Sequence, residues 1–131
     1  MRTWCLWIGL GLMASTAAAQ QHTSALRESL LKQWAYTGWE EFGVFTPADS
    51  LRRADRLLLQ PDGSFHQVWQ GKERKGTFRF HEATRQLSLT DASTQSTVNF
   101  GVKKVTDSTL VLEYQSPDLV RTRHRFIVVR Q

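Results

Sequence analysis

Four histidines are the side chains of this sequence best suited to acid–base or metal chemistry, namely His22, His66, His81 and His124. His66 and His81 fall on consecutive predicted strands, where they could approach each other and bind one metal ion. No cysteine or carboxylate stands at a convincing spacing to complete such a site. We therefore predict no metal site.

Two adjacent carboxylates, Glu40 and Glu41, are the next candidates, because pairs of acids perform reactions such as glycoside hydrolysis. Neighbouring residues of a strand face opposite sides, so these two cannot act together on one bond. The sequence also lacks a Gly-x-Ser-x-Gly motif, a His-Glu-x-x-His motif and a glycine-rich phosphate loop. We predict a protein without enzymatic activity and without a cofactor.

Residues 1–19 have the organisation of a signal peptide. Arg2 provides the positive charge, WCLWIGLGLMA the apolar segment, and Ala17–Ala19 the small residues before a cleavage site. The apolar segment is too short to cross roughly 30 Å of bilayer as a helix, so we expect export to the periplasm or the medium, with no transmembrane segment in the mature chain.

Residues 20–131 would form a single domain of 131 − 19 = 112 residues. Cys5 lies in the signal peptide, so the mature chain has no disulfide.

Only one segment of the mature chain has a helical pattern. Leu26, Leu30, Leu31 and Trp34 follow helical spacing and predict a short amphipathic helix over 24–33. The rest of the chain alternates between apolar and polar residues in the manner of β-strands. The predicted strands cover residues 34–45, 55–60, 64–70, 74–81, 85–90, 95–105, 109–115 and 119–129.

Short polar connections join these strands. Pro61-Asp62-Gly63 predicts a hairpin, and QGKERKG, HEATRQ and TDASTQS are connections of the same kind, with one longer loop around TPADSLRRA. None is long enough for a helical crossover, so the strands should be antiparallel in sequential order. About eight such strands leave two open edges unless the sheet closes. We therefore predict an all-β fold, an antiparallel up-and-down barrel with a short N-terminal helix.

The order of these features resembles the small exported bacterial lipocalin-like (calycin-type) β-barrel domains. The shared features are the leader, the short helix, Trp34 at the start of the first strand, the LLLQPDGSF hairpin, the GTFRF strand and the VTDSTLVLEY strand. Thr106 and Asp107 match a turn of the family, although the tyrosine that often follows is absent, as is the glycine before the tryptophan. The resemblance implies that Arg125 or Arg130 packs over Trp34, and that the barrel binds a small apolar molecule.

The interior of an eight-stranded barrel is just wide enough for its own side chains or for one small ligand. Two interpretations therefore stay open, a core filled by aromatic side chains and an open apolar pocket. The pocket hypothesis depends on the polar side chains of Gln67, Thr122 and His124 among the aromatic ones. The predicted ligand-binding residues are Trp34, Phe65, Gln67, Trp69, Phe78, Phe80, Tyr114 and His124.

Positive charge is the remaining feature, since the mature chain has 16 basic and 12 acidic side chains and a formal charge of +4. Arg121, Arg123 and Arg125 alternate on one predicted strand and share its outer face, which suits contact with an anionic surface or an acidic protein. The stripe has no stacking aromatic residues, so nucleic acid is not an expected partner.

Two functions follow: a non-enzymatic binder of a small hydrophobic ligand, or a filled-core interaction or inhibitor module. We expect a monomer in both cases.

Overall fold

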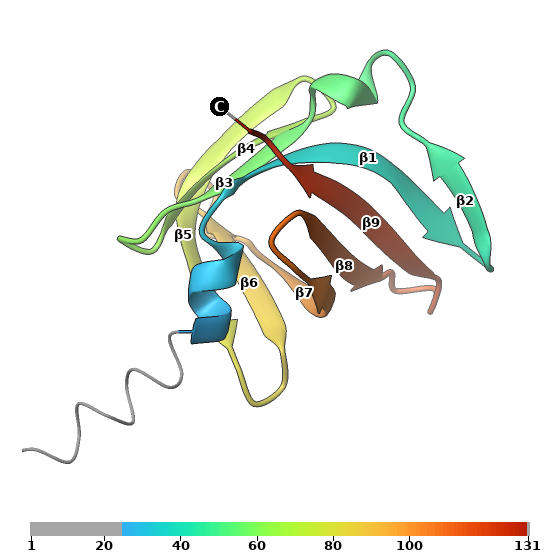
Figure 1. Ribbon diagram of the computed structural model, residues 1–131. Helices are drawn as coiled ribbons and strands as arrows, with labels where there is room; N and C mark the ends of the chain where they lie inside the picture. The colour runs from blue at the N-terminus through green and yellow to red at the C-terminus, as the bar shows by residue number, and fades with distance from the viewer. Residues whose placement is uncertain (1–24, 131) are drawn as a thin grey trace, which may run out of the picture.

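Antiparallel strands wrap around a common interior in the computed structural model of this protein (Figure 1). The structure describes residues 25–130; the predicted signal peptide and His22 lie outside the described residues. A helix over residues 25–30 precedes the strands. The strands are β1 (Gln33–Glu41), β2 (Val44–Pro47), β3 (Arg56–Leu59), β4 (Ser64–Trp69), β5 (Lys72–His81), β6 (Gln86–Asp91), β7 (Thr97–Val105), β8 (Thr109–Gln115) and β9 (Arg121–Val128), and the 3-10 helix η1 (Arg52–Ala54) lies between β2 and β3.

The sheet closes into a barrel because β1 has strand partners on both sides. On one side it pairs with β9, from Trp34 opposite Val128 to Glu40 opposite Arg123. On the other side the first residues of β1 pair with β3, and each later strand pairs with its successor up to β9. Closure leaves no free edge in this ring of eight strands. The predicted antiparallel up-and-down barrel with a short N-terminal helix is confirmed.

The segment predicted as a single strand over 34–45 is a hairpin of two strands. β1 ends at Glu41, and the chain turns back into β2, which pairs with β1 from Gly38 opposite Pro47 to Glu41 opposite Val44. β2 lies outside the closed ring, and all four of its residues are exposed. Sequence reasoning missed this hairpin because one short turn between two apolar stretches does not interrupt a strand-like pattern.

Most other boundaries differ from the prediction by one or two residues, and two of the differences change the local structure. The helix ends at residue 30, and β1 begins at Gln33, because backbone pairing with β3 replaces the last helical turn. QGKERKG is not a loop: Gln70 and Gly71 alone form the turn, and β5 begins at Lys72. Both turn residues have positive φ, 54° and 80°, as a tight two-residue hairpin turn requires.

The barrel end beside the N-terminal helix is filled by side chains. Trp34 is completely buried there, and its Nε1–H donates to the backbone carbonyl of Leu30 at 3.0 Å. The cation over the Trp34 ring is Lys32, whose Nζ lies 5.7 Å from the ring centroid. The expectation that Arg125 covers this ring is wrong, because Arg125 lies over Phe45 of β2.

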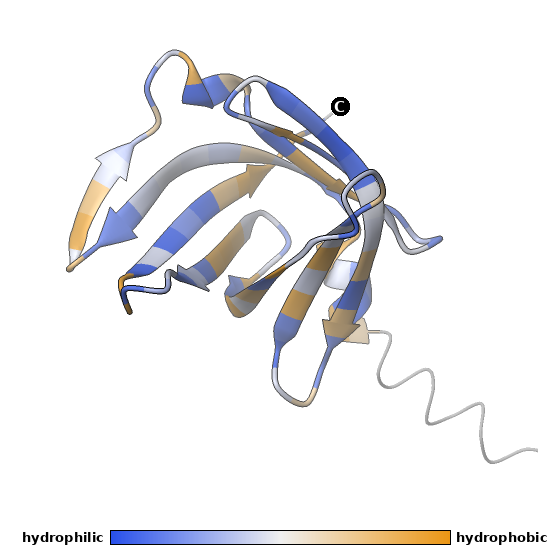
Figure 2. Ribbon diagram, turned by 180° about the vertical axis from the view of Figure 1, so that it is seen from behind, coloured by the Kyte–Doolittle hydropathy of each residue, from blue (hydrophilic) through white to orange (hydrophobic). Residues whose placement is uncertain are grey.

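Apolar and polar residues alternate along the barrel strands, as the bands of colour in Figure 2 show. In β3, Leu57 and Leu59 are buried, whereas Arg56 and Leu58, which alternate with them, are partly exposed. The period of two places one set of side chains inside the barrel and the other outside. The buried core consists of Leu30, Trp34, Tyr36, Ala48, Leu57, Leu59, Phe65, Phe78, Leu87, Leu89, Val102, Leu110, Leu112 and Phe126.

Candidate ligand-binding cavity

A cavity of about 440 Å³ occupies the end of the barrel opposite the N-terminal helix. It extends to the last residues of β1 and β6 and to the β4–β5 turn, which lie at this end. Its volume falls within the range of roughly 300–1,000 Å³ found for small-molecule sites. The lining residues are Tyr36, Trp39, Glu41, Arg52, Leu57, Phe65, Gln67, Trp69, Gln70, Arg74, Leu89, Asp91, Ser96, Val98, Phe100, Leu112, Tyr114, Thr122, His124 and Phe126.

The interior is therefore filled at one end and hollow at the other, which separates the predicted binding residues into two groups. Five of the eight line the cavity: Phe65, Gln67, Trp69, Tyr114 and His124.

The other three predicted residues lie away from the cavity. Trp34 is buried beneath the helix. Phe78 is buried with the guanidinium of Arg27 over its ring, 5.1 Å from the centroid. Phe80 is partly buried and packs against the core.

Arg52 of η1 reaches into a cluster of aromatic rings on the cavity wall. Its Cζ lies 4.4 Å from the ring centroid of Trp69, 4.8 Å from that of Tyr36 and 5.6 Å from that of Trp39. Tyr36 and Trp69 also contact each other edge-to-face, with centroids 5.0 Å apart. Ring faces attract a guanidinium cation, so the cluster fixes the position of Arg52.

Asp55 neutralises this arginine and holds it in place. The Asp55 side chain is fully buried, and its Oδ2 accepts a hydrogen bond from Arg52 Nε at 2.9 Å. Its Oδ1 accepts the backbone N–H of Gln70 at 2.9 Å. The carboxylate thus ties η1 to the β4–β5 turn, and the buried charge is paired as stability requires.

Tyr36 and His124 form a hydrogen-bonded pair beside Arg52, with Tyr36 Oη 2.9 Å from His124 Nδ1. Burial and the charge of Arg52 lower the pKa of His124 to about 4, and Glu41 partly opposes them. Burial raises the pKa of Tyr36 to about 12, although the charge of Arg52 opposes it. Both side chains are therefore neutral near pH 7.

Three residues of the Arg52 cluster were absent from the predicted binding residues. Tyr36 shares a strand face with Trp34, so strand alternation alone could have identified it. Trp39 would face outward by the same rule, but the pairing with β9 shifts register between Tyr36 and Gly38, and the shift turns Trp39 inward. Arg52 belongs to a predicted loop, and nothing in its local sequence indicates an inward side chain.

His66 and His81 lie on the neighbouring strands β4 and β5. His66 lies opposite Lys75 and His81 opposite Gln86, so the two histidines are not cross-strand partners. Within residues 25–130, no group of three or more His, Cys, Asp or Glu side chains could hold a metal ion.

Glu40 and Glu41 point to opposite sides of β1. Glu40 forms an ion pair with Arg125, whereas Glu41 lines the cavity and accepts a hydrogen bond from Thr122.

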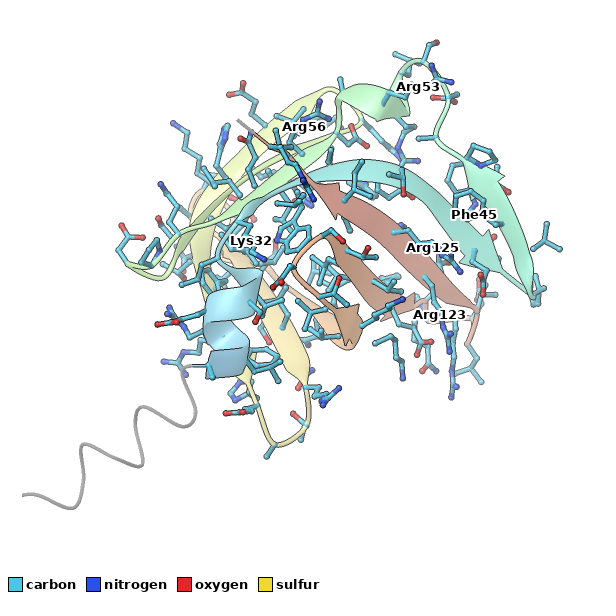
Figure 3. All side chains as sticks on the ribbon, in the orientation of Figure 1. Lys32, Phe45, Arg53, Arg56, Arg123 and Arg125 are labelled. Atoms are coloured by element: carbon cyan, nitrogen blue, oxygen red, sulfur yellow. The ribbon has the colours of Figure 1, made fainter. Side chains whose placement is uncertain are left out.

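The arginines of β9 lie on the exposed face of the barrel (Figure 3). Arg123 Nε is 3.0 Å from Glu113 Oε2, and Arg125 Nη2 is 2.6 Å from Glu40 Oε2. Two members of the predicted stripe are thus paired with acids of the neighbouring strands.

A comparison with solved structures gives a crystal structure of a lipocalin-like protein from Bacteroides uniformis. The match has a TM-score of 0.60 and 17% sequence identity, and it covers 77% of this chain and 99% of that chain. With the closed antiparallel barrel, it shows that this chain has a lipocalin-like fold. No protein-family model and no curated protein matches the sequence. In the part of the chain that the structure describes, no helix is long and apolar enough to cross a membrane.

Proposed function

We propose that this protein binds a small, predominantly apolar ligand in the cavity of its barrel. The supporting observation is the cavity itself, about 440 Å³ in volume and lined by aliphatic and aromatic side chains such as Leu57, Leu112 and Phe126. Nine polar or charged residues, including Gln67 and His124, also line it. Apolar walls with a small number of placed polar groups characterise ligand sites.

The expected affinity follows from the apolar surface that a ligand would bury. An alkyl chain of about ten carbons gains at most roughly 8 kcal/mol at about 0.8 kcal/mol per CH₂. Lost translational and rotational freedom costs several kcal/mol. At most about 4 kcal/mol then remains, so a purely apolar ligand of this size should bind near the millimolar range.

A neutral apolar dye, N-phenylnaphthylamine, tests this function by fluorescence titration. Val98 lines the cavity, so Val98→Phe should occupy part of it and weaken binding at least about tenfold, since the larger ring competes with the dye for space. Ile127 of β9 is half exposed and does not line the cavity, so Ile127→Phe is the matched control and should bind as the natural chain does. A dye that does not saturate, or that binds Val98→Phe unchanged, would contradict the proposal.

We propose binding without catalysis. The support comes from the lipocalin-like fold and from the cavity chemistry, in which Tyr36 and His124 are both neutral and Asp55 is engaged by Arg52.

The alternative function is an interaction module that contacts an anionic surface or an acidic protein through Arg121, Arg123 and Arg125. Its support is weaker, because Arg123 and Arg125 already form ion pairs with Glu113 and Glu40. Co-sedimentation with anionic vesicles that is lost in high salt, and lost in the variant with all three arginines changed to serine, would favour it.

We also propose that residues 1–19 direct export to the periplasm or the medium. N-terminal sequencing of protein recovered from those fractions should begin at Gln20. Full-length protein confined to the cytoplasm would contradict this proposal.

A further inference from the structure

Arg52 is one of four charged residues that line the cavity, and its side chain is only 16% exposed. The rings of Tyr36 and Trp69 lie against the guanidinium. A guanidinium donates hydrogen bonds only within its own plane, so groups over its faces leave its edges available.

One edge of the guanidinium is already hydrogen-bonded, and N–H donors remain available on its other edges. The Nε–H donates to Asp55, while the two terminal NH₂ groups carry the other four of the five N–H donors. The Tyr36 hydroxyl lies beside them, and the charge of Arg52 and a hydrogen bond from it oppose the rise in the pKa of Tyr36 that burial causes. One hydroxyl cannot use four donors, so Arg52 can accommodate a further acceptor from the cavity.

The Tyr36–His124 pair adds one more donor to the same part of the wall. If the hydroxyl donates to Nδ1, the imidazole carries its hydrogen on Nε2; if Nδ1–H donates, the hydroxyl hydrogen is free. In either tautomer one hydrogen is left for a third group. Arg52 and this pair together form a donor-rich patch on an apolar wall.

We infer that Arg52 binds the carboxylate of an elongated apolar acid whose hydrocarbon chain fills the cavity. This inference rests on the proposed ligand-binding function and names its ligand class. The chain would extend towards Leu57 and Phe65, since Leu57 lies opposite Trp34 near the helix end of the barrel.

The acidic groups near the cavity determine whether the cavity as a whole, or only contact with Arg52, favours an acidic ligand. Asp55 is fully buried and has both oxygens engaged, so a ligand would not meet it directly. Glu41 and Asp91 line the cavity, and their charges balance those of Arg52 and Arg74. The lining therefore has no formal net charge, and selection of an acid depends on direct contact with Arg52.

Three ligands of equal chain length test the inference by titration calorimetry near neutral pH: decanoic acid, decanol and decylamine. Charge-assisted hydrogen bonds should make the acid bind roughly 10- to 100-fold more tightly than the alcohol. The amine should bind more weakly than the acid, because Arg52 repels it. Equal binding of acid and alcohol would overturn the inference and leave the proposed function intact. Failure of all three to bind would count against the proposed function itself.

Variants then locate the acid preference. Arg52→Gln alone would leave Asp55 unpaired, so we combine it with Asp55→Asn to keep the buried pair neutral. This double variant, with folding checked by circular dichroism, should bind acid and alcohol equally. Arg53→Gln is the matched control, because Arg53 is exposed on the same segment and does not line the cavity (Figure 3); it should keep the preference. An acid preference that survives in the double variant would place the anion elsewhere and refute the role of Arg52.

Discussion

Acidification should destabilise this protein through His124, before most carboxylates are protonated. Burial and the charge of Arg52 lower the pKa of His124 from its ordinary value of 6.5 to about 4 in the folded state. Between these two pH values the unfolded chain binds a proton that the folded chain does not. Stability from this group is therefore fully present above about pH 6.5 and is lost as the pH falls towards about 4.

The size of the loss follows from the two pKa values. The difference, (6.5 − 4) × 1.36, gives an upper bound of about 3 kcal/mol. His124 is partly exposed, and solvent screening reduces the expected loss to about 2 kcal/mol. Three neighbours set the environment of the imidazole: Tyr36, which is neutral, Arg52, which opposes protonation, and Glu41, which favours it.

Urea denaturation followed by tryptophan fluorescence measures this loss. His124→Gln is the reference, because an amide can still meet the Tyr36 hydroxyl but does not titrate. The stability of the natural chain relative to this variant should fall by about 2 kcal/mol between neutral pH and pH 4. Other titrating groups largely cancel in that difference. A difference that stays constant over this range would refute a buried, neutral His124.

Three further predictions concern the barrel and its buried charge, each measured by urea denaturation. Trp34→Ala should cost about 3–5 kcal/mol, because it removes a completely buried side chain; a loss below about 1 kcal/mol would be inconsistent with that packing. Gly76→Ala should cost about 1–3 kcal/mol or more, because its methyl group would collide with a carbonyl of β6, whereas Gly101→Ala has open space and should be nearly neutral; equal effects would contradict the β5–β6 packing. Asp55→Ala should cost about 3–5 kcal/mol by leaving a cation unpaired, while Asp107→Ala on the exposed surface should cost less than about 1 kcal/mol; comparable losses would show that the buried pair does not stabilise the fold.

Part of the cavity wall could be predicted from the sequence because it lies on regular strands. Phe65, Gln67 and Trp69 share one face of β4 at a spacing of two residues, and all three line the cavity. The same rule could not assign Phe78 and Phe80, since alternation distinguishes inside from outside but does not say at which depth of the barrel a side chain lies.

The sequence by itself determined the order of the strands, their antiparallel pairing and the closure of the barrel. These features depend on local alternation, short turns and the cost of open edges, all of which are properties of neighbouring residues. The tertiary structure alone decided that one end is filled and the other hollow.

Two non-local events produce that difference. The register shift in β1, where it pairs with β9, turns Trp39 inward. The rings of Trp39 and Trp69 then contact the guanidinium of Arg52, which its neighbour Asp55 holds by a local hydrogen bond. The strand pairing and the ring contacts join residues that are distant in sequence, so no short window of the sequence contains them.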